Sequence, residues 1–387
     1  MNPASKSPPT LFVNAQLVDP QQAPTTTEPG SLLSNAGVVC SPRTHFFSSE
    51  EQPTVVDCQG KHLTPGFIDV QINGSHGCDY SKEPTLESIE HSRRSLLKTG
   101  CTSHCPTLVS LTSPEYRSLL PLLTSPTPGC SDNLGLHLEG PHFCPEKKGA
   151  HLLPNICDPS DFGGWKDMVG PEWDKVKIVT LAPELPNSLG LISSLSSHSI
   201  IPSMGHTSCT YDQGLSALSQ GAGLITHLYN AMSPFHHRQP SLVGLSSSMP
   251  FSIISDGVHV HPAAVNLAFQ GNKSGCILVT DAMAAMGLPD GEYTLGSMEV
   301  TKGEGKATLK GTDTLAGSVA SIDECLAKFL SFTSCSIEEG VACVTTNPAR
   351  LLGLSGKKGT LAVGSDADLV LWGDGVERVW KSGVEVQ

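Results

Sequence analysis

The sequence predicts an α/β fold, a (β/α)8 TIM-like barrel, together with a small β-sandwich domain built from both termini. The first observation is that short apolar runs recur through the middle of the chain, most of them followed by a stretch long enough for a helix. This alternation is expected of repeated βα units. The second observation is that short β-prone runs near both ends are separated by turn-forming residues.

Eight apolar runs are the expected barrel strands. They are Gly66–Ile72, Thr102–Val109, Leu134–Leu138, Lys177–Leu181, Ile200–Met204, Gly223–Leu228, Phe251–Ser255 and Cys276–Thr280. The expected helices between them include Glu87–Leu97, Pro114–Leu123, Tyr211–Ser219 and Pro262–Phe269. An open doubly wound sheet is the alternative, but it would carry a glycine-rich phosphate-binding turn after its first strand. The segment NGSHG at 73–77 lacks that fingerprint.

The β-prone runs at the two ends define the expected domain organisation. Residues 1–63 and 346–387 would each contribute part of the small β domain, and residues 64–345 would form the barrel. The polar tract Asp19–Ser34 is expected to be a loop or a disordered excursion, and Gly291–Gly311 a β-hairpin inserted after the eighth strand. The expected terminal strands are Leu11–Val18, Gly37–Cys40, Thr54–Cys58, Thr360–Val363, Ala367–Trp372 and Val379–Val386.

The composition argues against several classes of function. The 387 residues carry a net charge of −13, which is unsuited to binding nucleic acid or an anionic membrane. No stretch approaches the roughly 18 apolar residues of a membrane span, and the start, MNPASKSPPT, has no apolar signal-peptide core. The 13 cysteines lack regular spacing. This favours reduced thiols in a cytoplasmic protein over disulfides or zinc fingers.

Polar residues follow the ends of the expected strands, where barrels place their catalytic groups. They are Gln71, Asn73, Thr107, Glu139, Glu184, His206, His227, Asp256, His259 and Asp281. Glu139, His206 and His227 form a suitable ligand set for a divalent metal ion, because two neutral imidazoles and one carboxylate leave a position open for water. Taken singly, each histidine is more often a structural hydrogen-bonding residue. Their joint placement at strand ends favours metal binding.

Asp281 ends the eighth strand within the string LVTDAM. In one interpretation it caps the next helix. In the other it faces the water of the metal site and accepts a proton from it. Closure of the barrel would bring this strand beside the first one, whose end carries Gln71 and Asn73.

Several strings around these residues match a known pattern. They are LTPGFIDVQING (63–74), HLEGPHFCPEKKGAH (137–151), LAPE (181–184), GHT (205–207), THLYNAM (226–232), SDGVH (255–259), VTDAM (279–283), LAGS (315–318), NPARLLGL (347–354) and GSDADLVLW (364–372). Over nearly its whole length the chain resembles the amidohydrolase superfamily and, within it, the N-acetylglucosamine-6-phosphate deacetylases. The most specific strings are HLEGPH, the Asn-Ala-Met after His227, and the Gln-x-Asn at 71–73.

The resemblance implies a mononuclear metal site. Superfamily members with His-x-His on the first strand often hold two metal ions, whereas here both positions are amides, Gln71 and Asn73. One divalent ion per subunit is therefore expected, bound by Glu139, His206 and His227. Zinc is the expected ion, and iron, cobalt and manganese accept the same ligand types. The two amides would line the pocket or hydrogen-bond the bound water.

The resemblance also implies a reaction. The expected activity is hydrolysis of N-acetylglucosamine 6-phosphate to glucosamine 6-phosphate and acetate, in amino-sugar catabolism. Asp281 would accept the proton of water and donate it to the leaving amine, and His142 or, by family position, His151 would donate to the oxyanion. A homodimer is expected, because in family members part of the loop that contains Arg238 reaches across the dimer interface. The implied substrate residues are Ala150, His151, Asn230, Ala231, Arg238, Asp256, Gly257, Val258, His259, Leu315, Ala316 and Gly317.

Two alternatives to this activity stay open at the level of sequence. The same barrel could act on another amide, such as a cyclic amide or an N-acetyl amino acid. Asn230, Ala231 and Arg238 argue against that, because a substrate without phosphate gives their loop nothing to bind. The chain could instead be a non-catalytic scaffold, but all three metal-ligand candidates and Asp281 are present.

Overall fold

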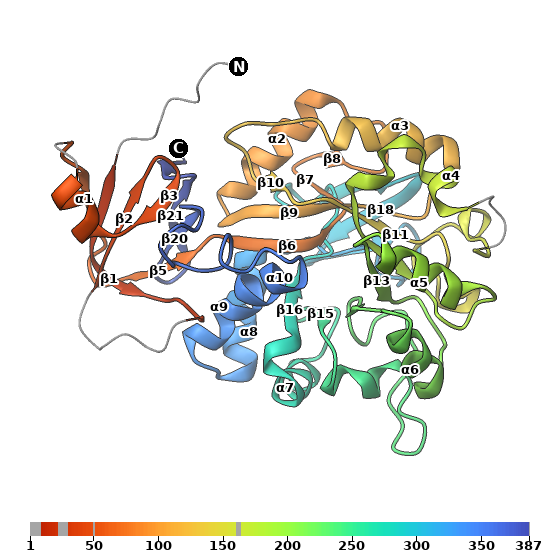
Figure 1. The fold of residues 1–387 in the computed structure, drawn as a ribbon. Helices are drawn as coiled ribbons and strands as arrows, with labels where there is room; N and C mark the ends of the chain where they lie inside the picture. Colours follow the sequence, from red (N-terminus) through yellow and green to blue (C-terminus); the bar gives the residue numbers. More distant parts are fainter. Residues whose placement is uncertain (1–8, 22–29, 49–50, 160–163, 387) are drawn as a thin grey trace.

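The computed structural model describes residues 9–21, 30–48, 51–159 and 164–386. Its centre is a nearly closed barrel of parallel strands (Figure 1). In spatial order these strands are β6 (Phe67–Ile72), β9 (Cys101–Leu108), β11 (Leu136–Glu139), β12 (Val176–Leu181), β13 (Ile201–Met204), β14 (Leu224–Ile225), β15 (Phe251–Ile254) and β16 (Cys276–Val279). Each one falls on a run predicted from the sequence, so the barrel prediction is confirmed. The short strand β10 (Asp132–Asn133) pairs with β9.

The barrel closes where β16 meets β6. The backbone N–H of Asp281 donates to the carbonyl of Gln71 at 2.9 Å, and Ile72 and Ala282 form an isolated parallel bridge. Because all eight strands run in parallel, their carboxyl ends meet at one end of the barrel. The polar residues that follow the strands are thereby brought together.

Helices cover the outside of the barrel, and several begin at a capping box (Figure 1). In this motif an N-cap Ser or Thr exchanges hydrogen bonds with the residue three positions later. It starts α2 (Leu86–Leu97), α3 (Ser113–Leu123), α6 (Tyr211–Ser219), α8 (Ile322–Thr333) and α9 (Ile337–Val344). The other helices are α1 (Pro42–Ser48), α4 (Trp165–Val169), α5 (Ser188–Ser197), α7 (Pro262–Gly271) and α10 (Thr346–Leu351).

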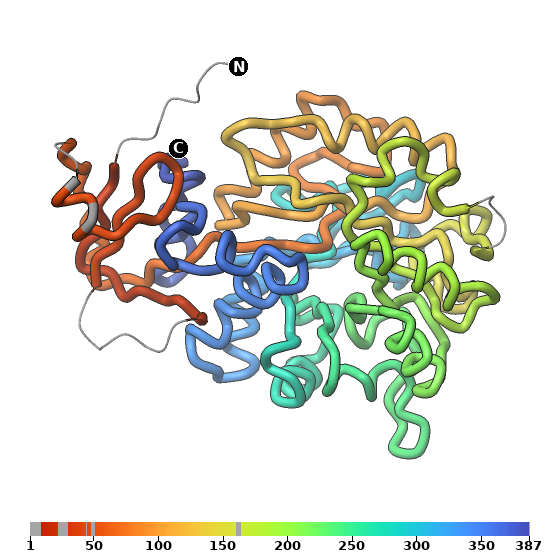
Figure 2. The backbone as a smooth tube through the Cα atoms, viewed as in Figure 1, coloured from red at the N-terminus to blue at the C-terminus, as the bar shows by residue number. Residues whose placement is uncertain are grey.

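The unit between β14 and β15 departs from the βα pattern. Its described residues contain only a 3₁₀ helix, η4 (Leu242–Ser247), where the other units have an α-helix. The preceding loop, 233–241, projects from the barrel below α6 (Figure 2). The remaining 3₁₀ turns are η1 (Pro145–Lys147), η2 (Leu153–Asn155), η3 (Pro171–Lys175) and η5 (Lys273–Gly275).

A second, smaller sheet combines both ends of the chain. Its strand order is β22 (Val384–Glu385), β21 (Val376–Lys381), β20 (Leu369–Trp372), β5 (His62–Pro65), β1 (Thr10–Leu17), β2 (Gly30–Asn35) and β3 (Val38–Cys40), and β4 (Thr54–Asp57) also pairs with β1. The two ends share one hydrophobic core, in which Phe12 and Trp380 pack edge to face with ring centroids 4.8 Å apart. The domain limits at 63/64 and 345/346 stay predictions.

Four predicted segments differ in the structure. Val379–Val386 is not one strand, because a turn at Ser382 and Gly383 divides it between the antiparallel strands β21 and β22. Residues 22–29 of the tract expected to be a loop lie outside the described residues, but Gly30–Ser34 belongs to β2, where it pairs with β1. Thr360–Val363 is not a strand, because its backbone instead forms turns that Asp19 and Ser365 bind. The 291–311 insertion is a three-stranded sheet, not a hairpin: β17 (Gly291–Leu295), β18 (Met298–Gly303) and β19 (Lys306–Leu309). Two further strands, β7 (Gly74–Ser75) and β8 (Cys78–Asp79), pair with each other.

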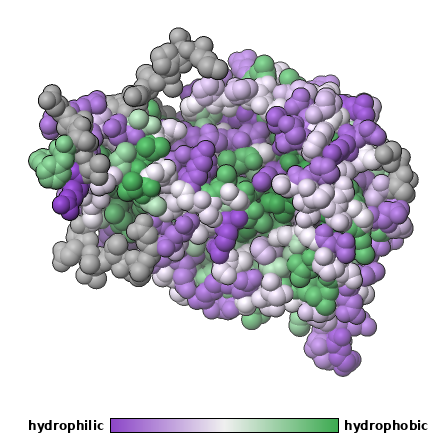
Figure 3. All heavy atoms as spheres, viewed as in Figure 1, coloured by the Kyte–Doolittle hydropathy of each residue, from purple (hydrophilic) through white to green (hydrophobic). Residues whose placement is uncertain are grey.

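The surface mixes hydrophilic and hydrophobic residues on the face drawn in Figure 3. Large apolar side chains are exposed singly or in pairs, and Phe46 and Phe47 on α1 are the most exposed. Within the described ranges, no helix is long and apolar enough to cross a membrane.

A buried ion-pair cluster joins the small sheet to the barrel. Lys381, at the end of β21, lies 2.7 Å from Asp368 and 2.6 Å from Asp132 of β10. Lys358 lies 2.8 Å from the same two carboxylates and 2.9 Å from Asp366. Burial lowers the pKa of Lys358, but the charges of Asp368 and Asp132 outweigh it and raise that pKa above its usual value. The Lys358 ammonium therefore stays charged and helps to offset the three carboxylates.

Replacing Lys381 by methionine is expected to lower the free energy of unfolding by about 3 kcal/mol, because it leaves buried Asp368 undercompensated. Thermal and urea denaturation would measure the change. Lys310→Met is the matched control, since Lys310 pairs with Glu292 and Glu299 at 3.5 and 3.4 Å on the exposed insertion. That variant should differ from wild type by less than about 1 kcal/mol. Equal losses in the two variants would contradict a structural role for the cluster.

Candidate active site

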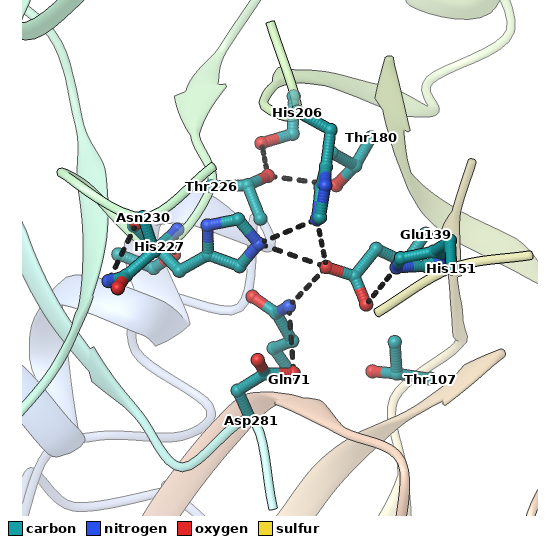
Figure 4. A network of polar contacts seen from close by, with 12 residues as sticks. Gln71, Thr107, Glu139, His151, Thr180, His206, Thr226, His227, Asn230 and Asp281 are labelled. Carbon is teal, nitrogen blue, oxygen red and sulfur yellow. Dashed lines mark hydrogen bonds and ion pairs between the residues drawn. The ribbon is translucent and has the colours of Figure 1, made fainter. Parts of the chain in front are cut away.

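Three of the predicted metal ligands converge at the carboxyl end of the barrel (Figure 4). Glu139 is the last residue of β11, and His206 and His227 follow β13 and β14 by two residues. The Oε1 atom of Glu139 lies 3.1 Å from Nε2 of His206 and 3.0 Å from Nε2 of His227. The two Nε2 atoms are 3.1 Å apart. One oxygen and two nitrogens thus face a common point.

This arrangement fits a divalent metal ion. Ligand atoms about 2.0–2.1 Å from a tetrahedral metal are about 3.3 Å from one another, close to the separations observed. The Nδ1–H of His206 donates to the carbonyl of Lys147 at 2.8 Å, so its Nε2 keeps a lone pair for a metal. Glu139, His206 and His227 also fall within the two overlapping groups of possible metal ligands at this end of the barrel.

Asp281 lies beside these ligands and is held by the two amides of β6. The Nδ2 group of Asn73 donates to its Oδ1 at 2.8 Å, and Nε2 of Gln71 donates to the same oxygen at 3.1 Å. Gln71 also donates to Oε1 of Glu139 at 3.0 Å. Burial and the nearby charge of Glu139 raise the pKa of Asp281 to about 7. A bound dication would oppose that increase.

His151 is the nearest imidazole outside the ligand set. Its Nε2 lies 3.8 Å from Oε2 of Glu139. The backbone N–H of Ser110 donates to its Nδ1 at 3.1 Å, so the ring carries its proton on Nε2, which faces the site. Burial and the charge of His206 lower the pKa of His151 to about 3, which keeps the ring neutral. His142, the other predicted oxyanion donor, instead donates from Nδ1 to the carbonyl of Cys157 at 3.1 Å.

A cavity of about 150 Å³ opens onto these groups. Among its walls are Asn73, Glu139, His206, His227 and Asp281. Of the predicted substrate residues, the cavity is lined by Ala150, His151, Asn230, Ala231, His259, Leu315 and Gly317. Further apolar wall comes from Val109, Ile254 and Leu295, the last from the three-stranded insertion.

Five predicted substrate residues are not among the lining residues: Arg238, Asp256, Gly257, Val258 and Ala316. Asp256 instead orients His259. Its carboxylate accepts from the backbone N–H of His259 at 2.8 Å and from the ring Nδ1–H at 2.6 Å, which leaves Nε2 of that ring for the cavity.

Arg238 is exposed and lies on the projecting 233–241 loop. His236 and Gln239 pair across this loop, and the Arg238 guanidinium lies 2.7 Å from Nε2 of the adjacent His237. No arginine or lysine is found among the described residues that line the cavity. Among the described residues of one copy of the chain, the pocket lining therefore has no permanently charged cation for a phosphate.

Sequence reasoning missed the groups that hold the site residues in place. Ser110 fixes the tautomer of His151 and the carbonyl of Lys147 fixes that of His206, and neither could be predicted without the fold. For Asp69, the sequence did contain a pattern that indicates a place beside the site. Asp69 shares a strand face with Gln71 and Asn73, since alternate residues of a strand point the same way, yet it was not singled out.

Comparisons with known proteins agree with this fold. The profile of the Amidohydrolase family matches residues 62–386. The chain is 38% identical over 387 residues to the N-acetylglucosamine-6-phosphate deacetylase of Danio rerio, covering 96% of this chain and 94% of that protein. It is 42% identical over 344 residues to the enzyme of that name from Homo sapiens, covering 84% of each.

A solved structure of similar shape comes from Mycobacterium smegmatis. It is an aspartate-to-alanine mutant of N-acetyl-D-glucosamine-6-phosphate deacetylase in complex with N-acetyl-D-glucosamine-6-phosphate. The TM-score is 0.86 and the identity 28%, covering 98% of this chain and 99% of that one. The barrel and its buried cluster of candidate metal ligands indicate an amidohydrolase. The chain belongs to that family and, within it, to the N-acetylglucosamine-6-phosphate deacetylases.

Proposed function

We propose that this protein hydrolyses N-acetylglucosamine 6-phosphate to glucosamine 6-phosphate and acetate in amino-sugar catabolism. The observation that carries the proposal is the meeting of Glu139, His206 and His227 beside Asp281 in one cavity. Relatives with 38–42% identity that bear the name of this deacetylase support the choice of substrate.

Glu139, His206 and His227 would hold a single divalent ion, with zinc as the proposed identity. Such an ion supplies Lewis acidity, which polarises an acetamide carbonyl and makes water more acidic. Asp281 accepts the proton of the attacking water and then donates it to the amine nitrogen, because an amide anion is too basic to leave unprotonated. Gln71 and Asn73 hold the Asp281 carboxylate in position for both transfers.

His151 is the proposed donor to the developing oxyanion. Its proton is fixed on Nε2 by the hydrogen bond from Ser110 to Nδ1, so a donor faces the reacting carbonyl without any rearrangement. Its low pKa keeps the ring from acting as a competing general acid. Asn230, Ala231 and His259, which also line the cavity, would bind the sugar phosphate.

The missing cation for the phosphate would come from a second copy of the chain. Arg238 lies on a loop that projects away from the barrel. Its planar guanidinium group suits a phosphate bound in the pocket of a neighbouring subunit. We therefore include a homodimer in the proposal, with Arg238 of the partner subunit completing each pocket. The thirteen free thiols fit a cytoplasmic location.

Arg238→Ala is expected to raise KM for N-acetylglucosamine 6-phosphate about 10- to 100-fold, through loss of hydrogen bonds to a charged group. KM for unphosphorylated N-acetylglucosamine should stay unchanged, because that sugar has no phosphate to lose contact with. Steady-state kinetics with both sugars would measure this. Equal increases in KM would contradict the phosphate role.

Mixed dimers would show which subunit supplies Arg238. A dimer of one Arg238→Ala subunit and one Asp281→Asn subunit has one site with both Asp281 and the Arg238 of its partner. Purified by two different tags, it should show about half the wild-type kcat per dimer and wild-type KM. If Arg238 served its own pocket, neither site would be complete and KM would stay high.

Release of acetate is the direct test of the proposed function. Metal-loaded protein would be incubated with N-acetylglucosamine 6-phosphate, and acetate measured by a coupled assay or NMR. The unphosphorylated sugar, an N-acetyl amino acid and a cyclic amide are the comparison substrates, and metal analysis of the same protein gives the ion and its stoichiometry. A preference for one of the last two substrates, or no hydrolysis at all, would reject the proposal.

A further inference from the structure

Three residues of the proposed active site have an unusual backbone conformation. The φ angles are +49° for His206, +28° for His227 and +47° for Asp281. Residues with a side chain rarely adopt this left-handed region, since their Cβ crowds the backbone there. Such a conformation persists only where the surroundings fix it. Each of these residues must therefore be held by contacts outside its own side chain.

The first two residues are held by groups from neighbouring strands. After His206, the carboxylate of Glu184 accepts from Oγ1 of Thr207 at 2.5 Å and from the backbone N–H of Ser208 at 2.6 Å. The backbone N–H of His227 itself donates to Oγ of Ser252 on β15 at 2.8 Å. In both cases a side chain replaces the regular hydrogen bonding that a strand loses when its backbone turns.

Asp281 is held in the same way by Asp69, a carboxylate 1% exposed in the middle of β6. Its Oδ2 accepts from the Thr280 hydroxyl at 2.5 Å. Its Oδ1 accepts from the backbone N–H groups of Thr280 at 3.3 Å and Gln71 at 3.2 Å. The Thr280 hydroxyl in turn accepts from the N–H of Ala282 at 3.1 Å. The residues on both sides of Asp281 are thus tied, through one hydroxyl, to the Asp69 carboxylate.

Burying a carboxylate in a barrel core is unfavourable unless its hydrogen bonds compensate. Among the described residues, no arginine, lysine or histidine donates to the Asp69 carboxylate. Its three donors, from Gln71 and Thr280, all belong to the seam between β6 and β16. A hydrophobic side chain would fill the same space at lower cost. The presence of this carboxylate therefore needs a reason beyond packing.

We infer that Asp69 is a positioning residue for catalysis, which holds Asp281 through Thr280 so that its carboxylate meets the hydrogen-bond donors Gln71 and Asn73. The inference rests on the proposed role of Asp281 as the group that transfers protons. Asp69 itself touches neither the cavity nor the metal-ligand atoms. Asp69 acts by fixing the backbone conformation at Asp281. A small rotation of that backbone would move the Asp281 carboxylate away from the reacting atoms.

A purely structural role for Asp69 makes different predictions. If the carboxylate only closed the barrel, its loss would lower the melting temperature and disturb the metal site and the substrate pocket together. A positioning role instead lowers kcat and leaves KM and metal content unchanged. Removing the Thr280 hydroxyl distinguishes the positioning role from the structural role, because the substitution can leave the volume of the side chain unchanged.

The experiment compares Thr280→Val, Thr280→Ser and Asp69→Asn with wild type in the full-length, metal-loaded protein. Valine has the shape of threonine without the hydroxyl, and serine restores the hydroxyl. Thr280→Val is expected to lower kcat about 10- to 100-fold, the effect of losing a buried hydrogen bond that fixes a reacting group. KM and metal stoichiometry should stay within about twofold, and Thr280→Ser should recover kcat to within about threefold of wild type. Asp69→Asn should lower kcat with unchanged KM.

A crystal structure of metal-loaded Thr280→Val gives a readout that does not depend on activity. The Asp281 carboxylate is expected to lose its hydrogen bonds with Asn73 and Gln71. An unmoved Asp281 or a wild-type kcat in Thr280→Val would overturn the inference, as would equal losses in the valine and serine variants. If wild type releases no acetate, the proposed function fails, and the position of Asp281 in the valine variant still decides whether Asp69 holds it.

Discussion

Replacing Asp281 by asparagine is expected to lower kcat for N-acetylglucosamine 6-phosphate by about 10²- to 10⁴-fold, the usual contribution of a general acid and base. Metal content should stay at the wild-type value, because Glu139, His206 and His227 are untouched. Asparagine tests the proton transfer separately from the shape of the side chain. Its side-chain oxygen can still accept from Gln71 and Asn73, which both donate to Oδ1, so the shape is kept and only the proton transfer is lost.

The measurements are single-turnover and steady-state acetate release, together with metal analysis of the same preparation. Asp290→Asn is the matched control, since Asp290 is exposed in the segment that follows the same strand, and it should leave kcat unchanged. Wild-type turnover in Asp281→Asn would remove Asp281 from the mechanism. Loss of metal in parallel with activity would assign it to metal binding instead.

Replacing Glu139 by glutamine is expected to abolish stable metal binding and, with it, nearly all activity. Its Oε1 lies within 3.1 Å of both histidine nitrogens, and a neutral amide is a far weaker ligand than a carboxylate. Changes to groups that only orient a ligand cost about 10- to 100-fold in affinity, so loss of a ligand itself should exceed about 100-fold. Calorimetric zinc titration and metal analysis after gel filtration would measure this.

Removing the metal ion from the wild-type protein and restoring it tests the same metal dependence. Wild type stripped by a chelator should lose activity and regain it when zinc, cobalt, manganese or iron is added, and its melting temperature should rise with free metal concentration because metal binds the folded state. His91→Ala, at an exposed histidine on α2, should behave as wild type. Full activity of the chelated wild-type protein would refute a metal-dependent reaction.

The barrel could be predicted from the sequence because its strands are buried on both faces. A strand buried on both faces tends to be rich in apolar residues, as β15 (FSII) and β16 (CILV) are. In β6, β9, β11, β12, β15 and β16 every residue, or all but one, is buried. The convergence of Glu139, His206 and His227 followed from the same fact. Once the strands are parallel, the residues after them must share one end of the barrel.

The conformation of the unit after β14 and the position of the loop that contains Arg238 could not be predicted from buried strands. Loop 233–241 carries the sequence of a phosphate-contacting segment, but its path depends on η4 and on what lies beyond one copy of the chain. Within the described residues Arg238 lies outside the cavity. Asp256 is itself a predicted substrate residue, but its carboxylate is turned toward His259. Local hydrogen bonding decides that orientation, and residue type does not reveal it.

By itself, the sequence determined which residue types stand at the strand ends, and so which groups are available for binding a metal ion and transferring a proton. The tertiary structure alone decided how those groups are held. Hydrogen bonds that Gln71, Asn73 and Ser110 donate, and one that the Lys147 carbonyl accepts, join positions dozens to hundreds of residues apart. Strand and helix periods are short-range properties, whereas tautomers, backbone twists and carboxylate orientations depend on partners that only folding brings within hydrogen-bond distance.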